Sequence, residues 1–241
     1  MELAGAVVIV TGGAVRLGKA MALGVAGAGA RVVVHYGHSA EAARRTVAEI
    51  KSLGGEALAV RADFLDAGAA GAVVGQAAER FGRVDALVNS ASIYEPADVA
   101  GTTESLWDRH FAINLKAPFF LCQAFAAQLG ERRGHIVNIA DWRGTRPTAS
   151  RVAYTLTKAG LIAMTQSLAQ ALAPNVQVNA IAPGVILPPP GEGDEYVQRL
   201  LPSIPLRRSG SPADVVEALL YLLRSDFVSG EVLYVTGGQH L

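Results

Sequence analysis

The sequence has few of the features that mark specialised protein classes. Its 241 residues include a single cysteine, Cys122, and only 17% are charged. One cysteine excludes an internal disulfide and a cysteine-based zinc site, and it favours a reducing compartment such as the cytoplasm. Lysine plus arginine equals aspartate plus glutamate, at 21 each. A net charge of zero argues against a nucleic-acid partner and against attachment to a membrane surface through bulk charge.

Long hydrophobic runs are also missing. The longest apolar stretch, residues 20–30, contains three glycines and ends at Arg31, which is too short to cross a bilayer. Glu2 stands where a secretory signal would carry basic residues. Since 51% of the chain is hydrophobic, a sizeable core is available. We therefore expect a globular intracellular protein with no membrane partner.

Short β-branched runs alternate with longer Ala-rich segments. The runs are almost continuously apolar, which is typical of strands covered on both faces. The segment 39–53 has helical spacing before Gly54, and Ser211 to Asp214 reads as a helix N-cap. The alternation predicts one α/β domain over residues 1–241, a doubly wound parallel sheet with helices on both faces. Its predicted strands are 6–10, 31–35, 57–60, 86–89, 135–139, 176–180 and 232–235.

A glycine-rich loop, residues 11–18 (TGGAVRLG), directly follows the first predicted strand and leads into a helix. Glycines there permit a tight turn and the close approach of a pyrophosphate to the helix N-terminus. The alternative is a purely structural turn. Because the loop follows the first strand, its position favours a dinucleotide site on a Rossmann-type sheet.

The end of the second predicted strand lacks the acidic residue by which NAD-binding folds hold the ribose hydroxyls. No carboxylate lies between Val32 and Ser39. A 2′-phosphate would instead find His38, the Ser39 hydroxyl and the following helix N-terminus, with Arg16 nearby. The segment therefore favours NADP(H), although both histidines of the segment also suit a solvated turn.

One irregular stretch, residues 183–193 (PGVILPPPGEG), follows a predicted strand. Open α/β sheets place their ligand crevice at that end of the strands. The stretch is either a surface loop without a role or the start of a segment, 183–205, that covers a substrate. Its position favours the second interpretation.

The chain resembles the short-chain dehydrogenases/reductases over essentially its whole length. The motifs that carry this resemblance are the glycine loop, Asp63 after the third strand, N-S-A-S at 89–92, Asn114, Y-T-L-T-K at 154–158, Pro183-Gly184 and Gly237-Gly238. Further positions are similar to the pteridine reductase branch. They are Arg16, His35-Tyr36 with Ser39, Tyr94, and Asp141, which stands where most members have a catalytic serine, thirteen residues before Tyr154.

The resemblance implies roles for individual residues. The catalytic set is Asp141, Tyr154, Lys158 and Asn114, with Asn114 holding a water that links Lys158 to bulk. The substrate contacts are Arg16, Tyr94, Asp141 and Tyr154, and the assembly is a homotetramer. The NADP(H) contacts are Gly12, Arg16, Leu17, Gly18, Tyr36, His38, Ser39, Asp63, Phe64, Ser90, Ala91, Ser92, Tyr154, Lys158, Pro183, Gly184 and Ile186.

The spacing of Tyr154 and Lys158 places both on one face of a helix. A nearby ammonium favours the phenolate, so we expect Lys158 to lower the pKa of Tyr154 and suit it to proton transfer. The alternative, an ordinary exposed pair, is disfavoured by the neighbouring motifs. Tyr94 is interpreted as a stacking surface for a flat heteroaromatic ring, or else as a core or rim tyrosine.

Asp141 is the most discriminating position. A carboxylate opposes the negative charge that develops when a ketone is reduced, but it suits protonation of a ring nitrogen. The alternative is a cap for the turn after the fifth strand. Trp142 and Arg143 directly follow Asp141, and they either lie at the edge of the pocket or lie outside it. The remaining candidates are interpreted as structural. Packing or a subunit interface accounts for Trp107, Phe111, Phe119 and Phe120, and Cys122 is expected to be buried and inert. No metal is expected, because the spacing of His110, His135 and His240 does not suit metal ligands.

The sequence thus predicts an NADPH-dependent reductase of a pterin-like heterocycle, of the dihydropteridine or dihydrofolate class. A reductase of ketones, sugars or 3-oxoacyl thioesters is the main alternative. A non-catalytic NADP(H) sensor is a third, which the joint presence of Tyr154, Lys158 and Asn114 disfavours.

Overall fold

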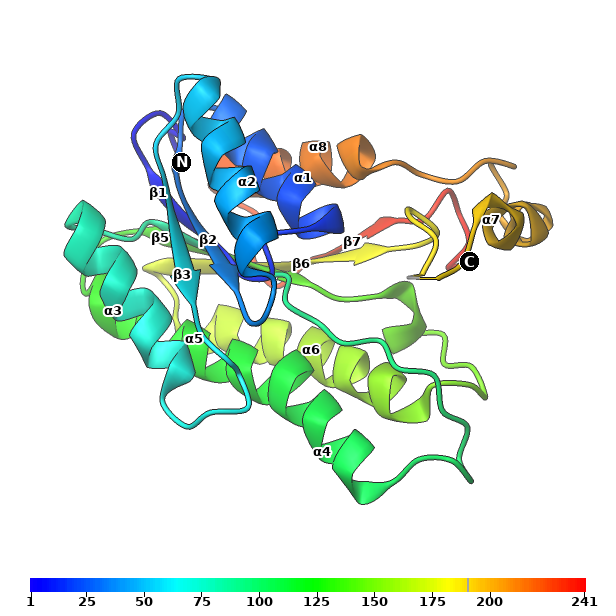
Figure 1. The fold of residues 1–241 in the computed structure, drawn as a ribbon. Coiled ribbons are helices and arrows are strands. Elements are labelled where there is room, and N and C mark those ends of the chain that lie inside the picture. Colours follow the sequence, from blue (N-terminus) through cyan, green and yellow to red (C-terminus); the bar gives the residue numbers. More distant parts are fainter. Residues whose placement is uncertain (190) are drawn as a thin grey trace.

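The computed structural model describes residues 1–189 and 191–241. All the predicted strands are present and form one parallel sheet in the order β3-β2-β1-β4-β5-β6-β7 (Figure 1). The chain runs outward from β1 in both directions, since β1 pairs with β2 on one side and β4 on the other. This is the doubly wound, Rossmann-type topology that was predicted. The strands are β1 (Val7–Val10), β2 (Arg31–Tyr36), β3 (Ala57–Arg61), β4 (Ala86–Asn89), β5 (Gly134–Ile139), β6 (Val176–Pro183) and β7 (Val232–Val235).

The predicted strand ends differ from the observed ones where pairing extends a strand into a less apolar segment. β6 was predicted to stop at residue 180, but its pairing with β7 continues to Pro183, opposite Val235. β2 continues to Tyr36, which pairs with Arg61. The irregular stretch therefore begins after Pro183. Pro190, which falls within it, lies outside the described residues.

Helices cover both faces of the sheet, as predicted (Figure 1). Val8 and Val10 pack into the core beneath α1, α2 and α8, and Val7 and Ile9 pack into the core on the side of α3, α5 and α6. The alternation follows from the period of two along a strand. The helices are α1 (Arg16–Gly27), α2 (Ala40–Ser52), α3 (Ala69–Phe81), α4 (Glu104–Phe111), α5 (Ala117–Leu129), α6 (Val152–Ala171), α7 (Asp194–Leu200) and α8 (Pro212–Arg224), with short turns η2 (Trp142–Gly144) and η3 (Leu201–Ser203).

Local signals fixed the ends of two helices. α2 lies between Ser39 and Leu53, which are its cap residues, and Gly54 follows with a φ of 85°. α8 begins with the capping box of Ser211 and Asp214. Within residues 1–189 and 191–241, no helix is long and apolar enough to span a bilayer.

The predicted helix around Asn114 is interrupted. A π-helical turn, η1 (Ala112–Lys116), joins α4 to α5 and contains the buried Asn114. Such turns occur often at functional sites. Here the turn directs Asn114 toward the segment after β4.

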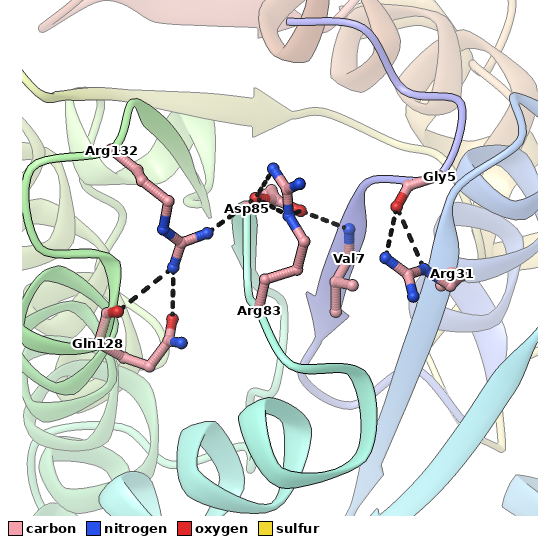
Figure 2. A network of polar contacts seen from close by, with 7 residues as sticks. All are labelled: Gly5, Val7, Arg31, Arg83, Asp85, Gln128 and Arg132. Atoms are coloured by element: carbon pink, nitrogen blue, oxygen red, sulfur yellow. Dashed lines mark hydrogen bonds and ion pairs between the residues drawn. The ribbon is translucent and has the colours of Figure 1, made fainter.

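A network of polar contacts ties the sheet together at the amino ends of its strands (Figure 2). Asp85, directly before β4, is almost fully buried. Its carboxylate accepts the backbone N–H of Val7 at 2.9 Å and pairs with Arg83 at 2.7 Å and with Arg132 at 3.4 Å. Beside it, the Arg31 guanidinium donates to the Gly5 carbonyl at 2.8 Å. These contacts connect β1, β4 and the loop before β5.

Candidate active site

A cleft of about 350 Å³ opens at the carboxyl ends of β1, β4, β5 and β6. This is the expected place for a ligand in a doubly wound sheet, and the volume suits a small molecule. The predicted residues that line it are Gly12, Arg16, Leu17, Gly18, Ser90, Ala91, Ser92, Tyr94, Asp141, Tyr154, Lys158, Pro183, Gly184 and Ile186. Val15, Ile139, Ala140 and Leu187 line it as well and were not predicted. The predicted residues outside the lining are Tyr36, His38, Ser39, Asp63, Phe64 and Asn114.

The glycine loop is packed backbone against backbone. A Cβ at Gly18 would lie 2.1 Å from the Gly12 carbonyl oxygen, and one at Gly12 would lie 3.0 Å from Ala91 Cα. Gly12 also has a φ of 64°. Among the described residues, no side chain caps the N-terminus of α1 at Val15. Residues 16–18 of that first turn line the cleft, and an uncapped helix N-terminus at this place fits a pyrophosphate.

His35 anchors the glycine loop, which corrects its interpretation as part of a solvated turn. It is buried, its Nδ1 accepts the Gly12 N–H at 3.1 Å, and its Nε2 lies 3.0 Å from the Ala62 carbonyl. The ring is therefore the neutral tautomer with its proton on Nε2. Burial lowers the pKa of His35 to about 4. Phe64 stacks on the ring with centroids 4.3 Å apart.

A carboxylate does lie at the end of β2, but it comes from the segment after β3. Asp63 Oδ2 is 3.3 Å from Nε2 of the exposed His38. The prediction had counted only the residues between Val32 and Ser39, so it missed this neighbour. Within the described residues, the N-terminus of α2 at Ser39 has no side-chain cap. Its N–H groups remain a suitable partner for a phosphate.

Asp141 and Tyr154 form the centre of the site. The Tyr154 hydroxyl donates to Asp141 Oδ2 at 2.9 Å. Asp141 Oδ1 accepts the backbone N–H of Arg143 at 2.8 Å and so caps η2. The capping interpretation of Asp141 is therefore confirmed, and the contact of its other oxygen with Tyr154 leaves that oxygen at the cleft, where its catalytic role stays a prediction.

Lys158 lies beneath this pair but does not act on it as predicted. Its buried Nζ donates to the Ile139 carbonyl at 2.8 Å and lies 5.5 Å from the Tyr154 ring centroid. Burial lowers the pKa of Lys158 to about 8. The pKa of Tyr154 is raised well above its ordinary value, first by burial and then by the Asp141 carboxylate. The expectation that Lys158 lowers the pKa of Tyr154 is wrong for this site.

Two buried side chains hold the segment that carries Tyr94. Asn114 Oδ1 accepts the Ile93 N–H at 2.9 Å, and its Nδ2 donates to the Ile93 carbonyl at 3.0 Å. His110 Nε2 accepts the Glu95 N–H at 3.4 Å. Tyr94 is thus fixed on both sides, with its ring 4.7 Å from that of Tyr154 in an edge arrangement. The water relay through Asn114 stays a prediction.

Sequence reasoning missed a buried polar framework beneath the cleft. The Thr11 hydroxyl accepts the N–H groups of Ser90 and Ala91 at 2.9 and 3.0 Å. Asn138 accepts from Asn89 at 2.8 Å and donates to a threonine of α6 at 2.9 Å. The signal was present, because asparagines inside apolar strands need partners.

The remaining candidates are placed as follows. Cys122 is buried, as predicted, and burial raises the pKa of its thiol to about 12. Trp142 and Arg143 do not line the cleft. Trp107, Phe119 and Phe120 are each more than a third exposed, so core packing does not account for them. Nowhere in residues 1–189 and 191–241 do three histidine, cysteine or acidic side chains group as a metal site would require.

Comparison with known proteins finds a matching family model and several relatives. The family model described as enoyl-(acyl carrier protein) reductase matches residues 13–240. The structure is similar to FolM alternative dihydrofolate reductase 1 from Brucella suis in complex with NADP, at a TM-score of 0.94, 36% identity, and coverage of 100% and 96% of the two chains. The sequence is 33% identical to the 3-oxoacyl-[acyl-carrier-protein] reductase FabG of Staphylococcus aureus, over 97% of both chains. A blue fluorescent protein from a metagenomic library, in complex with NADPH, matches at a TM-score of 0.92 and 30% identity, over 99% of each chain.

Proposed function

The chain belongs to the short-chain dehydrogenase/reductase family and is an NADP-dependent oxidoreductase, and from this premise we propose that it reduces a pterin-like ring of the dihydropteridine or dihydrofolate class. The resemblance to two FolM structures at 36% identity supports this substrate class. FabG relatives at 33% identity support the alternative, a 3-oxoacyl thioester. The chemistry of the cleft favours the first.

The observation that carries the proposal is the contact between Asp141 and Tyr154, at 2.9 Å. Reduction of a ketone places negative charge on oxygen next to the tyrosine hydroxyl. A carboxylate about 4 Å from that oxygen opposes the charge by about 4 kcal/mol at an effective dielectric of 20. Reduction of a ring C=N bond instead adds a proton to nitrogen, and a pterin presents N–H donors that a carboxylate accepts.

In the proposed reaction, each residue of the site has a separate role. Bound NADPH supplies the hydride. Tyr154 donates the proton to the ring nitrogen, and Asp141 accepts substrate N–H groups and passes a proton from water back to the tyrosine. Tyr94 forms one wall for the flat ring. Lys158 holds the nicotinamide ribose, and Asn114 links it to bulk water.

We assign the cofactor contacts to the lining of the cleft and to the end of β2. The α1 N-terminus and Arg16 take the pyrophosphate, and His38 with Ser39 takes the 2′-phosphate. Tyr36, Asp63 and Phe64 border the adenine half. Ser90, Ala91 and Ser92 border the nicotinamide half, with Pro183, Gly184 and Ile186 opposite.

Residues 183–205 cover the substrate in this proposal. Pro183, Gly184 and Leu187 already line the cleft. The Arg16 guanidinium donates to the Pro188 carbonyl, which connects the glycine loop to this segment. A substrate held beneath the segment is shielded from water.

A panel of NADPH-oxidation assays tests the substrate class. Its members are dihydrobiopterin, dihydrofolate, a 3-oxoacyl thioester, a simple ketone and several sugars. We expect turnover of the pterins at kcat/KM values at least tenfold above the others, the scale of one lost charge-assisted contact. Turnover of the thioester, ketone or sugars alone overturns the pterin assignment. NADPH binding without any turnover favours a sensor.

We also propose a homotetramer, because two separate apolar surfaces are exposed. Phe119 and Phe120 of α5 are 40% and 43% exposed, and Trp107 of α4 is 37% exposed. Elsewhere, Phe227 is 98% exposed beside β7, which is an edge strand of the sheet. A tetramer with dihedral symmetry requires two distinct self-complementary surfaces, and we assign them to these two places.

Sedimentation at working concentration tests the assembly. The unmodified chain is expected to sediment as a tetramer. Phe119→Glu should reduce the tetramer to dimers, because the surface around Phe227 is unchanged. Leu53→Glu is the control: it places the same charge on an exposed leucine outside both surfaces, and the protein should remain a tetramer. A monomeric parent protein overturns the proposal.

A further inference from the structure

Arg151 occupies an unusual position at the edge of the candidate active site. It is the N-cap of α6, three residues before Tyr154, and its backbone is left-handed, with φ 57° and ψ 49°. A bulky residue rarely adopts this conformation, and such residues gather at functional sites. The backbone N–H donates to the Ala97 carbonyl at 2.9 Å, which fixes the residue against the Tyr94 segment.

The side chain of Arg151 lies over the ring that the proposed function assigns to the substrate wall. Its guanidinium carbon is 4.3 Å from the Tyr94 ring centroid. Burial raises the pKa of Tyr94, and the positive charges of Arg143 and Arg151 act against that rise. The flat wall of the cleft therefore has a cationic rim, defined by Tyr94 and the Arg151 guanidinium above it.

The acidic groups nearby are already bound to other partners. Glu95 pairs with Arg109 at 2.8 Å, and Asp98 accepts the Gly101 N–H at 2.7 Å. Asp141 accepts from Tyr154 and reaches Arg143 only at 3.8 Å. Within residues 1–189 and 191–241, no carboxylate lies within 4.0 Å of the Arg151 guanidinium.

The charge of Arg151 is thus held half-buried without a protein counter-ion. Its Nε is enclosed and has no hydrogen-bond partner among the described residues. A buried or half-buried guanidinium ordinarily has an acceptor, and its planar fork matches a carboxylate or a phosphate. An anionic group on a ligand would supply the missing acceptor at this place.

We propose that the cationic rim is an anion subsite, in which Arg151 binds a negatively charged group on the arm of the substrate while the ring lies against Tyr94. The inference rests on the proposed function for the position of the ring. A pterin with a carboxylate arm and a thioester with a phosphate arm both present an anionic group that the Arg151 guanidinium would bind. The subsite therefore selects for arm charge within either substrate class.

Matched substrate pairs test the subsite. In the pterin pair, dihydrofolate has a carboxylate arm and dihydrobiopterin has a neutral one. In the thioester pair, acetoacetyl-CoA has phosphates and the acetoacetyl N-acetylcysteamine thioester has none. The quantity compared is the ratio of kcat/KM between the charged and the neutral member of each pair.

Substitutions at Arg151 are chosen for its backbone. Arg151→Asn removes the charge and tolerates the left-handed conformation, and Arg151→Lys retains the charge. We expect Arg151→Asn to lower the charged-to-neutral ratio about tenfold, mainly through KM, and Arg151→Lys to restore part of it. Arg224→Asn, on the exposed surface of α8, removes the same charge at a distance and should leave the ratio unchanged.

An unchanged ratio in Arg151→Asn, with the neutral substrate still turned over, overturns the subsite. Equal losses for charged and neutral substrates also overturn it, since they show a structural role for Arg151. If the parent enzyme reduces only thioesters, the pterin assignment fails and the thioester pair decides the subsite on its own.

Discussion

The Tyr154 hydroxyl donates a hydrogen bond of 2.9 Å to Asp141 Oδ2. The carboxylate and the burial of the ring together raise the pKa of Tyr154 well above its ordinary value. The tyrosine therefore keeps its proton throughout the neutral range, and a raised pKa by itself opposes donation, so the transfer depends on Asp141 and the substrate nitrogen as proton-transfer partners. Because Asp141 is also fixed by the Arg143 backbone N–H, the pair is held in place before any substrate arrives.

Replacing Tyr154 by phenylalanine should abolish turnover while leaving NADPH affinity nearly intact. Phenylalanine retains the ring that packs against Tyr94 at 4.7 Å but removes the transferable proton. A loss of about a hundredfold or more in kcat is expected from the loss of positioned proton transfer. Rates under single-turnover conditions and fluorescence titration of NADPH measure the two effects separately. Near-parent single-turnover rates would refute the assigned role.

The pH dependence of stability should reveal the buried Lys158. Its folded pKa is about 8, below the unfolded value of 10.5, so between these values the unfolded chain binds more protons. The contribution of Lys158 to the free energy of unfolding therefore rises with pH in that window. Above about pH 10 the raised pKa of Tyr154 acts in the opposite sense, and stability is lost as the unfolded tyrosine ionises.

Urea unfolding of the parent and of Lys158→Met, at about pH 7 and about pH 9.5, checks this. Methionine removes the buried charge, so the variant should gain relative to the parent at the lower pH, and the difference should shrink at the higher pH. A difference that is constant with pH would contradict a depressed pKa at Lys158.

The preference for NADP(H) over NAD(H) should depend on the N-terminus of α2. Ser39→Ala removes a hydroxyl donor at that terminus and should weaken NADPH binding about tenfold or more with little effect on NADH, since hydrogen bonds to a charged phosphate contribute about 1.5–3 kcal/mol each. Fluorescence titration with both cofactors measures the preference. Ser52→Ala, at the other end of the helix, is the matched control. Equal weakening for both cofactors would argue against a phosphate contact at Ser39.

The sequence was sufficient to predict the strands, their parallel doubly wound arrangement and most of the cleft lining. Apolar runs and the helix signals at Ser39 and Ser211 are local, and the doubly wound topology follows from their alternation. Motif spacing then placed Tyr154 and Lys158 on one helix face and Asp141 at the end of β5. These predictions hold because each depends on residues close together in the chain.

The electrostatics of the site were not predictable in the same way. The pKa of Tyr154 depends on burial and on a carboxylate thirteen residues away in sequence, not on the lysine four residues along. Asp63 reaches His38 from the segment after β3, and the loop anchor His35 is recognisable only once β2 and β3 are paired. Contacts between strands fix these features, and sequence spacing does not encode them.

The Asp85 network predicts a stability effect separate from catalysis. Asp85→Ala leaves the Val7 N–H and the Arg83 guanidinium without their shared partner. Because both arginines are partly exposed, the main cost is the buried Val7 N–H left without an acceptor, about 1–3 kcal/mol. Arg132→Gln, whose contact is 3.4 Å long and partly exposed, should cost less than about 1 kcal/mol. Urea unfolding compares the two, and equal losses would show that Asp85 does not organise the network. Activity per folded molecule should be unchanged in both.

The most direct test compares pterin and ketone reduction in the parent, Asp141→Asn and Asp141→Ser. Asparagine keeps the size of the side chain but removes the negative charge, and serine offers the hydrogen-bond donor that suits a ketone oxygen. We expect Asp141→Asn to lower kcat/KM for dihydropteridine by about tenfold or more with NADPH affinity unchanged, and Asp141→Ser to shift relative activity toward ketones. Pterin turnover at the parent level in both variants, or no pterin turnover in the parent, would contradict the pterin assignment.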